Sequence, residues 1–325
     1  MSRRFLVAPD SFKSTFDAAA VAAAVAAGIE AARGEADRCP VADGGEGTME
    51  VLLGALGGER RSAQVHDPLR RPVEASFGLL GDGETAIVEV AQASGLPLLA
   101  PEERDPEQAD TFGTGELIAA AVAAGAKRVL LAAGGSATTD GGRGAIEALQ
   151  EADALAVVAS VEVLCDVRTP YEDAAPVFAP QKGAGPAAVE RLTEKLDAFA
   201  AELPRDPRGL PMTGAAGGLS GGLWAHGATL RPGAEFVLDA LDFDARLARA
   251  DAAVSGEGRF DSQSLEGKIV GAIASRCAAA GKPLHLIVGQ NGLTEQPPAA
   301  ISSLSAASSL EEIQEAGGEL CRAGA

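Results

Sequence analysis

The sequence of 325 residues has few aromatic side chains, with only one Trp and one Tyr. Hydrophobic residues nonetheless make up 46% of the chain. This share argues against disorder of the whole chain and predicts an interior built from Ala, Val, Leu and Ile. The four cysteines lie far apart and form no CxxC pair. That pattern predicts buried free thiols in a reducing cytoplasm.

Positive charge is also scarce, because 27 Lys and Arg stand against 46 Asp and Glu, giving a net charge of −19. A surface this acidic repels phosphate polymers and anionic lipids, so we expect neither nucleic acid nor a membrane as partner. We expect no secretory leader and no membrane span, since no apolar leader region follows residues 1–5 and Gly28 and Glu30 interrupt the alanine-rich stretch at 18–32. We therefore expect a cytoplasmic protein that must supply positive charge locally to bind anions.

Both ends of the sequence show a regular alternation of apolar strands and helices. The strands expected there lie at 5–8, 39–42, 252–255 and 284–288. The middle begins differently, because residues 61–90 show the short alternating runs of antiparallel hairpins. The length also exceeds the usual size of a single core. We predict an α/β fold with a doubly wound, Rossmann-like domain (1–60 and 245–325), an inserted α/β domain with a mixed sheet (61–244), and an active site in the cleft between them.

The forty glycines cluster at the predicted carboxyl ends of strands. The longest cluster, GGSATTDGG at 134–142, follows a buried strand predicted at 128–133 and precedes a helix. Backbone N–H groups in such a loop bind anions without a basic side chain, and the hydroxyls and carboxylate of this loop suit phosphate and Mg²⁺. A tight turn explains a single loop equally well, and the sequence has neither GK[ST] nor GxGxxG here.

Other predicted strand ends carry polar residues as well. Three motifs stand out: APDSFKS at 8–14, DGGEGT at 43–48 and SGEGRFDSQS at 255–264. Their candidate functional residues, with the lysine that follows the third motif, are Ser11, Lys13, Asp43, Gly44, Glu46, Glu257, Arg259, Asp261 and Lys268. Asp166 at the end of a strand and Lys182 in the sequence PQKG are further candidates. The three histidines show no ligand spacing and are interpreted as structural or solvated.

Structural roles compete for several of these residues. A cation just before a helix start is poorly placed for the helix dipole, so Lys13 is expected to face a bound anion, with a solvated lysine as the alternative. Asp43 and Glu46 suit a metal or a substrate hydroxyl, whereas Glu46 could equally cap its helix. Ser264 is the better-placed cap for the following helix, which favours Asp261 as a metal ligand.

Taken in order, the motifs closely resemble those of the bacterial glycerate kinase family. The matching stretches are APDSFKS (8–14), PVADGGEGT (40–48), VEVAQASGL (88–96), TFGTGELI (111–118), GGSATTDGG (134–142), CDV (165–167), APQKGA (179–184), GAAGGLSGG (214–222) and SGEGRFDSQSLEGK (255–268). The family usually has glycine at Ser14, asparagine at Thr139 and Asn-Pro at Thr169-Pro170. The segment between Leu149 and Val161 is also shorter than the family pattern by roughly a helix and a strand.

The resemblance implies an ATP- and Mg²⁺-dependent kinase that phosphorylates D-glycerate in glyoxylate and sugar-acid catabolism. It favours 2-phosphoglycerate over 3-phosphoglycerate as the product. Phosphoryl transfer depends on positioning and charge neutralisation, so a strong base is not required. The oligomeric state stays open between a monomer and a homodimer.

Residue roles follow from residue type and from position at strand ends. Asp43 is assigned to orient the acceptor hydroxyl, and Lys13 and Lys182 to neutralise phosphate or the glycerate carboxylate. The expected substrate contacts are Ser11, Gly44, Glu46 and Arg259. The expected phosphate or nucleotide contacts are Gly134, Gly135, Ser136, Thr138, Asp140 and Lys268. The expected Mg²⁺ ligands are Asp166, Asp261 and Glu257.

Two other classes of function remain as alternatives. The α/β pattern alone fits an NAD-dependent oxidoreductase, which the missing GxGxxG disfavours. A nucleotide-sensing regulator without turnover is disfavoured by the carboxylates at the strand ends, because they would repel phosphate unless a metal lies between them.

Overall fold

A computed structural model of the chain describes residues 2–12, 15–265, 268–293 and 298–323. The chain divides into two compact units. The first unit comprises Met1–Asp43 and Ala234–Ala325, and the second unit comprises Gly44–Gly233. The boundaries predicted from the sequence, 60/61 and 244/245, both lie further along the chain than these.

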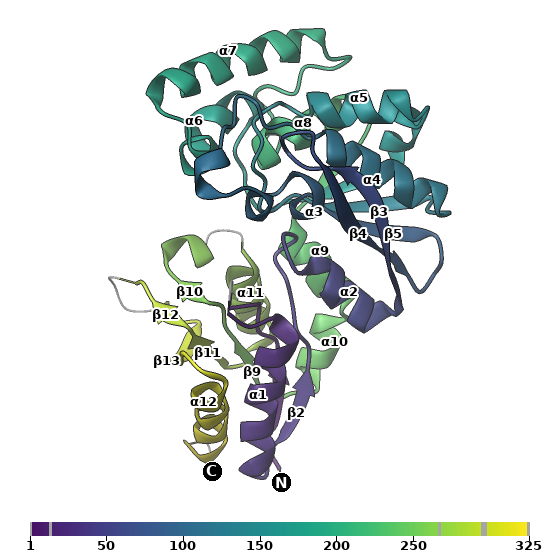
Figure 1. The fold of residues 1–325 in the computed structure, drawn as a ribbon. Coiled ribbons are helices and arrows are strands. Elements are labelled where there is room, and N and C mark those ends of the chain that lie inside the picture. The colour runs from purple at the N-terminus through teal and green to yellow at the C-terminus, as the bar shows by residue number, and fades with distance from the viewer. Residues whose placement is uncertain (1, 13–14, 266–267, 294–297, 324–325) are drawn as a thin grey trace. The chain divides into compact units, whose positions relative to one another are not determined.

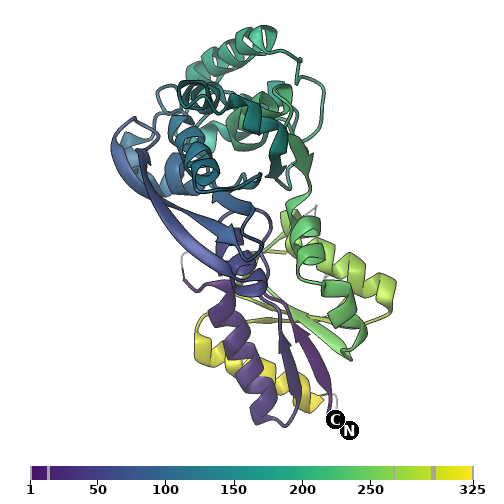
Figure 2. The same cartoon turned by 90° about the vertical axis from the view of Figure 1, so that its right-hand side faces the viewer.

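The first unit is built on a parallel sheet of five strands (Figure 1). Their order across the sheet is β13 (Ile301–Ala306), β11 (Leu284–Val288), β9 (Ala252–Ser255), β1 (Arg4–Val7) and β2 (Glu35–Arg38). Helices α1 (Ala18–Ala31) and α12 (Leu310–Ala323) lie side by side on one face, and α11 (Ile269–Ala280) covers the other (Figure 2). Two shorter helices, α9 (Gly233–Ala240) and α10 (Phe243–Ala248), precede β9.

Strand β2 lies earlier than predicted. The sequence favours 39–42 because Cys39, Val41 and Ala42 are apolar, and all three are indeed buried. The ladder with β1 instead uses Glu35–Arg38, of which all but Ala36 are polar, because β2 is the edge strand of the sheet. The apolar run continues alongside β1 beyond the ladder, with the N–H of Val41 donating to the carbonyl of Pro9 at 3.0 Å.

The second unit contains a mixed sheet of six strands, in the order β3 (Gly58–His66), β4 (Pro72–Leu80), β5 (Thr85–Glu89), β6 (Arg128–Ala132), β7 (Val161–Leu164) and β8 (Thr229–Arg231). Strands β3, β4 and β5 pair antiparallel, and β5 to β8 pair parallel. The predicted α/β class, with one parallel and one mixed sheet, is confirmed. Helix α2 (Thr48–Leu56) packs on β4 and β5, which places it in this unit and explains the early first boundary.

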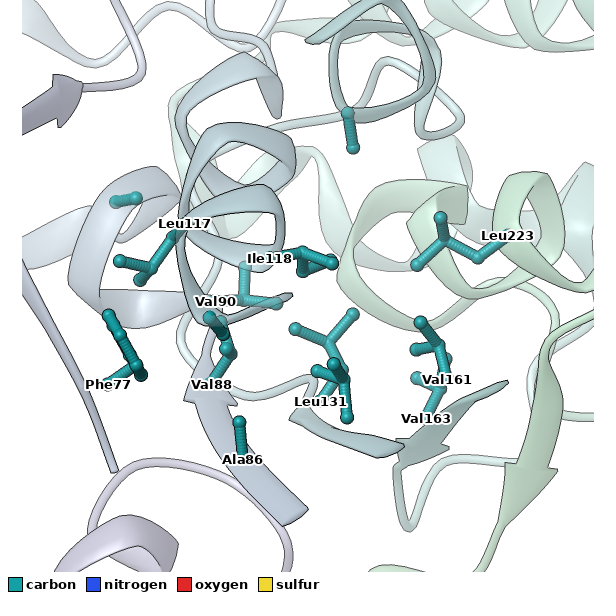
Figure 3. Packing of buried hydrophobic residues seen from close by; sticks show 14 of the residues in the cluster. Phe77, Ala86, Val88, Val90, Leu117, Ile118, Leu131, Val161, Val163 and Leu223 are labelled. Atoms are coloured by element: carbon teal, nitrogen blue, oxygen red, sulfur yellow. The ribbon is translucent and has the colours of Figure 1, made fainter. Parts of the chain in front are cut away.

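The core of this unit lies between the strands of the mixed sheet and the helices that pack on it. The remaining α-helices of this unit are α3 (Ala91–Ser94), α4 (Phe112–Ala123), α5 (Arg143–Glu151), α6 (Ala174–Phe178), α7 (Pro186–Glu202) and α8 (Leu219–Ala225). Figure 3 shows Leu117 and Ile118 of α4, and Leu223 of α8, above the buried side chains of β5, β6 and β7. Short aliphatic residues fill this layer, as the scarcity of aromatic residues predicts.

The single Tyr and the single Trp both belong to the second unit. Tyr171 is fully buried, and glycines enclose its ring, since a Cβ at Gly221 would lie 2.4 Å from its Cδ2 atom. Trp224 lies in α8, with the guanidinium of Arg205 4.2 Å from the centre of its ring. Both chromophores are therefore held by contacts within one unit.

All four cysteines are buried and free, which confirms the prediction of buried thiols. Burial raises the pKa of Cys39 to about 11, and of Cys165 and Cys277 to about 12. Among the described residues, no helix is long and apolar enough to span a membrane.

Helices α1 and α12 approach each other closely enough for their backbones to touch. A Cβ added to Gly28 of α1 would lie 1.9 Å from the carbonyl oxygen of Gln314, and one added to Gly317 of α12 would lie 2.6 Å from that of Val25. Real Cβ atoms do not approach so closely, so glycine is required at both positions. The contact at Gly28 explains why the alanine-rich helix α1 is interrupted by glycine.

We predict that Gly28→Ala destabilises the protein by about 1–3 kcal/mol, because the added methyl group forces the two helices apart. This loss exceeds the gain of about 1 kcal/mol that alanine brings to a helix interior. Gly54→Ala in α2 is the control, since no atom lies within 4 Å of its Cβ position, and it should be neutral or stabilising. Urea unfolding of both variants tests this, and a Gly28→Ala protein as stable as wild type would contradict it.

Candidate active site

A cavity of about 450 Å³ lies within the first unit. It opens where the chain leaves the carboxyl ends of β1, β9 and β11. Six residues predicted from the sequence line it together: Ser11, Asp43, Glu257, Arg259, Asp261 and Lys268. Of the other three candidates of these motifs, Gly44 and Glu46 do not line the cavity, and Lys13 lies outside the described residues. The cavity therefore brings together motifs that are more than 200 residues apart in the sequence.

The strand order explains why a cavity forms at this edge of the sheet. From β1 the chain winds through α1 to β2 on one side, whereas β9 winds through α11 to β11 on the other. The loops after β1 and β9 thus leave the sheet in opposite directions, and open α/β sheets bind ligands at such a switch point. The two loops stay joined at first, because the N–H of Asp10 donates to the carbonyl of Gly256 at 2.9 Å and the hydroxyl of Ser255 donates to that of Ala8 at 2.8 Å.

Backbone contacts also fix the loop after β9, which lines another side of the cavity. The loop after β9 continues into β10 (Arg259–Phe260), which pairs in parallel with β12 (Gln290–Asn291) after β11. A Cβ at Gly256 would lie 1.7 Å from the carbonyl oxygen of Ile287. Glycine there lets the loop after β9 run against the backbone of β11.

The cavity carries more acidic than basic side chains among the described residues. Asp10, Asp43, Glu257 and Asp261 contribute carboxylates, while Arg259 and Lys268 contribute positive charge. Asp10 is only 5% exposed, and the N–H of Ser11 donates to its Oδ1 atom at 2.6 Å. Asp10 is not among the residues predicted from the sequence, although it follows β1 in the motif that contains Ser11.

These oxygen donors suit Mg²⁺ better than a softer metal. No group of three or more His, Cys, Asp or Glu side chains is arranged to hold a metal in the described part of the chain. Mg²⁺ typically takes only one or two protein carboxylates and completes its shell with phosphate oxygens and water. The donor set therefore fits a Mg²⁺ ion that arrives with a phosphate ligand.

Helix α11 begins at the cavity without a side-chain cap. Its N-cap residue is Lys268, which has extended backbone and makes no capping bond, and Ile269 also lines the cavity. The prediction that Ser264 caps this helix is wrong. Ser264 instead accepts the N–H of Asp261 at 3.1 Å and closes its own short turn.

The second unit holds the other glycine motifs, which pack backbone against backbone. A Cβ at Gly134 would lie 2.7 Å from the Cα of Gly45, and one at Gly217 would lie 2.0 Å from the carbonyl oxygen of Thr138. The segments 44–47, 134–142 and 214–222 therefore meet directly. Close packing alone requires glycine at these points, whether or not the loop also binds phosphate.

Asp140 holds this arrangement together. Its Oδ2 atom accepts the N–H of Thr111 at 2.9 Å, the hydroxyl of Thr111 at 2.7 Å and the N–H of Gly144 at 3.0 Å. Its Oδ1 atom accepts the N–H of Gly142 at 3.1 Å. The carboxylate thus joins the first turns of α4 and α5, a structural role that differs from the predicted phosphate contact.

Lys182 is almost fully buried beside the same loop. Its Nζ atom donates to the hydroxyl of Ser136 at 2.9 Å and to the carbonyl of Thr138 at 2.5 Å, and only 3% of the residue is exposed. Burial lowers the pKa of Lys182 to about 7, although the nearby charge of Asp140 opposes the shift. Ser136 and Thr138 are buried too, so of the predicted phosphate contacts before Asp140 only Gly134 and Gly135 are accessible.

The glycerate kinase family model matches residues 5–154 and 149–323 of this chain. The chain belongs to the glycerate kinase family.

Named relatives in this family cover most of the chain. A glycerate kinase of Halalkalibacterium halodurans is 37% identical over 88% of this chain and 85% of its own length. The glycerate 2-kinase of Escherichia coli is 36% identical over the same shares. In a crystal structure, a glycerate kinase 2 candidate from Salmonella typhimurium LT2 matches with a TM-score of 0.84 and 33% identity, over 99% of this chain and 98% of that one.

The two parts of the glycerate kinase family match meet at 149–154. The resemblance of the motifs to the family predicts a shortened segment between Leu149 and Val161. In the structure, α5 ends at Glu151 and a 3-10 turn of six residues (Leu155–Ser160) leads into β7. A short connection therefore replaces the additional elements expected from the family pattern.

The remaining candidates of the glycerate kinase motifs lie in the second unit. Glu46 is exposed and precedes Gly47, the N-cap residue of α2, so it does not cap this helix. Gly44 is buried, and a Cβ there would lie 2.6 Å from the Cα of Gly233. Asp166 follows β7 and is half-buried. The three predicted metal ligands are thus divided between the units, with Glu257 and Asp261 in the first.

The low pKa of Lys182 predicts a specific pH dependence of stability. Because the folded pKa of about 7 lies below the ordinary value of 10.5, the unfolded chain binds an additional proton between these pH values. Stability that depends on Lys182 should therefore rise with pH, with a slope of up to about 1.4 kcal/mol per pH unit above pH 7. Lys182→Met removes the titrating group. The unfolding free energy of wild type should therefore rise relative to that of the variant from pH 7 to 9.5.

Denaturant unfolding at a series of pH values measures this difference. Lys195→Met, which removes an exposed lysine, is the control and should give a curve parallel to that of wild type. Parallel curves for Lys182→Met and wild type would contradict the lowered pKa.

Proposed function

We propose that this chain is an ATP-dependent kinase that phosphorylates D-glycerate to 2-phosphoglycerate in the cytoplasm, with Mg²⁺ as cofactor. The observation that carries the proposal is the cavity at the switch point of the first unit, which four carboxylates and two cations line together. Membership of the glycerate kinase family and the names of the relatives support the choice of glycerate. Neither the oxidoreductase nor the regulator has comparable support.

We also propose that the first unit is a doubly wound, Rossmann-like domain into which the second unit is inserted. Its parallel sheet, with helices on both faces, supports this description. In such domains the phosphates of a nucleotide lie at the first turn of a helix, beyond the carboxyl end of the sheet. Helix α11 starts at the cavity without a side-chain cap, so its first turn and Lys268 suit the nucleotide phosphates.

In the proposed reaction, a hydroxyl oxygen of glycerate bonds to the γ-phosphorus of ATP while the bond between this phosphorus and ADP breaks. Asp43 accepts the hydrogen bond of the attacking hydroxyl and orients it, and the proton leaves to Asp43 or to solvent. Arg259 and Ser11 are placed to bind the carboxylate of glycerate. Glu257 and Asp261 would hold Mg²⁺, which supplies neutralising charge to the phosphate oxygens. Alignment and neutralised charge suffice for a loose transition state.

The proposal is tested by incubating the purified protein with ATP, Mg²⁺ and D-glycerate and following the products by ³¹P NMR. We expect ADP and a phosphate monoester to appear together, and no turnover when glycerate or Mg²⁺ is left out. L-glycerate tests the enantiomer preference. If neither enantiomer raises ATP consumption above background, the chain is not a glycerate kinase.

The position of the new phosphate can be read separately. Enolase added without a mutase should convert 2-phosphoglycerate to phosphoenolpyruvate, which absorbs in the ultraviolet. If ATP is consumed but no phosphoenolpyruvate forms, phosphorylation is on the 3-hydroxyl.

Asp261 offers a direct test of the metal site. Because α11 has no side-chain cap, loss of a helix cap does not explain an effect at this residue. Asp261→Asn removes one charge from a site for a hard cation, so kcat should fall by orders of magnitude with folding preserved. We expect Asp244→Asn, the same change at an exposed carboxylate of the first unit, to leave kcat within about twofold of wild type.

The measurement is kcat as a function of Mg²⁺ concentration, beside a thermal melt of each variant. An Asp261→Asn protein with the kcat and Mg²⁺ dependence of wild type would remove Asp261 from the metal site. Glu257 would then be tested in the same way.

A further inference from the structure

Helix α2 starts without a local cap, immediately after the glycine loop at 44–47. Its N-cap residue is Gly47, in a left-handed conformation with a φ of 93°, and no side chain of the loop caps the helix. The N–H groups of a first helical turn need acceptors, which Ser, Thr, Asp or Asn at the N-cap usually provide. The positive φ favours glycine at position 47 and leaves the helix dependent on an acceptor from elsewhere.

Glu89 provides this acceptor from 40 residues further along the chain. It is the last residue of β5 and is only 3% exposed. The N–H of Met49 donates to its Oε1 atom at 2.9 Å, and the N–H of Gly47 and the side chain of Gln92 also bond to the carboxylate. A single buried carboxylate therefore fixes both the end of the loop and the first turn of α2.

The loop fixed in this way meets the other glycine segment of the second unit. The hydroxyl of Thr48 donates to the carbonyl of Gly45 at 2.7 Å, and the Cα of Gly45 occupies the space that a Cβ at Gly134 would need. Glu89 also pairs in register with Ala132 of β6, the strand that leads into Gly134. The Glu89 carboxylate thus lies at the edge of the sheet where the segments 44–47 and 134–142 meet.

Holding a charge at this position is costly. Burial raises the pKa of Glu89 above its ordinary value, and the nearby charge of Glu46 raises it further. A buried charge is weak evidence for stability, because its desolvation offsets much of what its bonds contribute. The backbone bonds that Glu89 accepts make a role in placing the loop the better reason for a carboxyl group here.

We propose that Glu89 is a positioning residue for the acceptor substrate. Its carboxylate holds the loop that carries Gly44 and Glu46, both expected from the sequence to contact glycerate, and it acts through this loop rather than by touching the substrate. This inference rests on the proposed glycerate kinase activity. In VEVAQASGL, Glu89 is the one charged residue, but no local spacing in the sequence links it to the loop at 44–47.

The test compares Glu89→Gln with Glu50→Gln. Glutamine keeps the size of the side chain but turns an NH₂ group toward the backbone N–H groups of Gly47 or Met49. Glu50 lies in the first turn of the same helix, but its side chain is 58% exposed and pairs with Arg60. The control therefore makes the same chemical change next to Met49 without touching the N-terminal amides.

Two measurements are needed on each protein. Hydrogen exchange of peptides that cover 43–52 reports on the protection of the amides of Gly47 and Met49. We expect this protection to fall at least tenfold in Glu89→Gln and to stay unchanged in Glu50→Gln. Steady-state kinetics should show a KM for glycerate raised at least tenfold, with the KM for ATP changed less than threefold. Glu89→Asp, which keeps the charge, should recover part of the loss, and it carries the test if the glutamine variant does not fold.

The outcomes separate this inference from the proposed function. Unchanged exchange in Glu89→Gln overturns the inference, and so does faster exchange with an unchanged KM for glycerate, which would make Glu89 a helix cap only. Equal effects on the KM values of ATP and glycerate would also overturn it. If wild type itself does not phosphorylate glycerate, the proposed function fails. The exchange data then test only whether Glu89 holds the loop.

Discussion

Direct contact between backbone atoms is the constraint on which the cavity of the first unit and the glycine loops of the second unit both depend. In the first unit, Gly256 lies against the carbonyl oxygen of Ile287, and in the second, Gly217 lies against that of Thr138. Neither contact leaves room for a Cβ atom. Loops packed in this way are fixed by their own main chains, which explains how a protein with 4% aromatic residues holds long loops in place. The entropy that glycine loses on folding is the cost of this arrangement.

Charge imposes a second constraint. The chain is strongly acidic, with a net charge of −19, and its candidate cavity repeats this imbalance on a small scale. Lys182 is buried beside the loop at 134–142 and does not line this cavity, and burial lowers its pKa to about 7. A phosphate ligand is therefore expected to bind as its Mg²⁺ complex, with Lys268 and the first turn of α11 as the fixed positive features.

Much of the fold and part of the site could be predicted from the sequence, because strand ends are marked by local patterns. The motifs that converge on the cavity all stand where an apolar run gives way to glycine and polar residues. The prediction placed β2 too late in the chain because it followed the apolar residues. Val41 and Ala42 are buried without belonging to the ladder. Asp10 was missed although it follows β1 in the motif that contains Ser11.

Long-range contacts explain most of what the sequence could not show. The pattern around Asp140 favours a phosphate ligand, and only the structure shows that its oxygens are used by two helix starts. Glu89 caps a helix 40 residues earlier in the chain. Such a bond leaves no trace in local spacing.

The positions of Tyr171 and Trp224 have a practical consequence for spectroscopy. Both chromophores belong to the second unit, so intrinsic fluorescence excited near 280 nm reports on that unit alone. The first unit, with its candidate cavity, contains only phenylalanine as an aromatic residue. Loosening of its sheet would leave the emission spectrum unchanged, and a tryptophan introduced there would be needed to observe it optically.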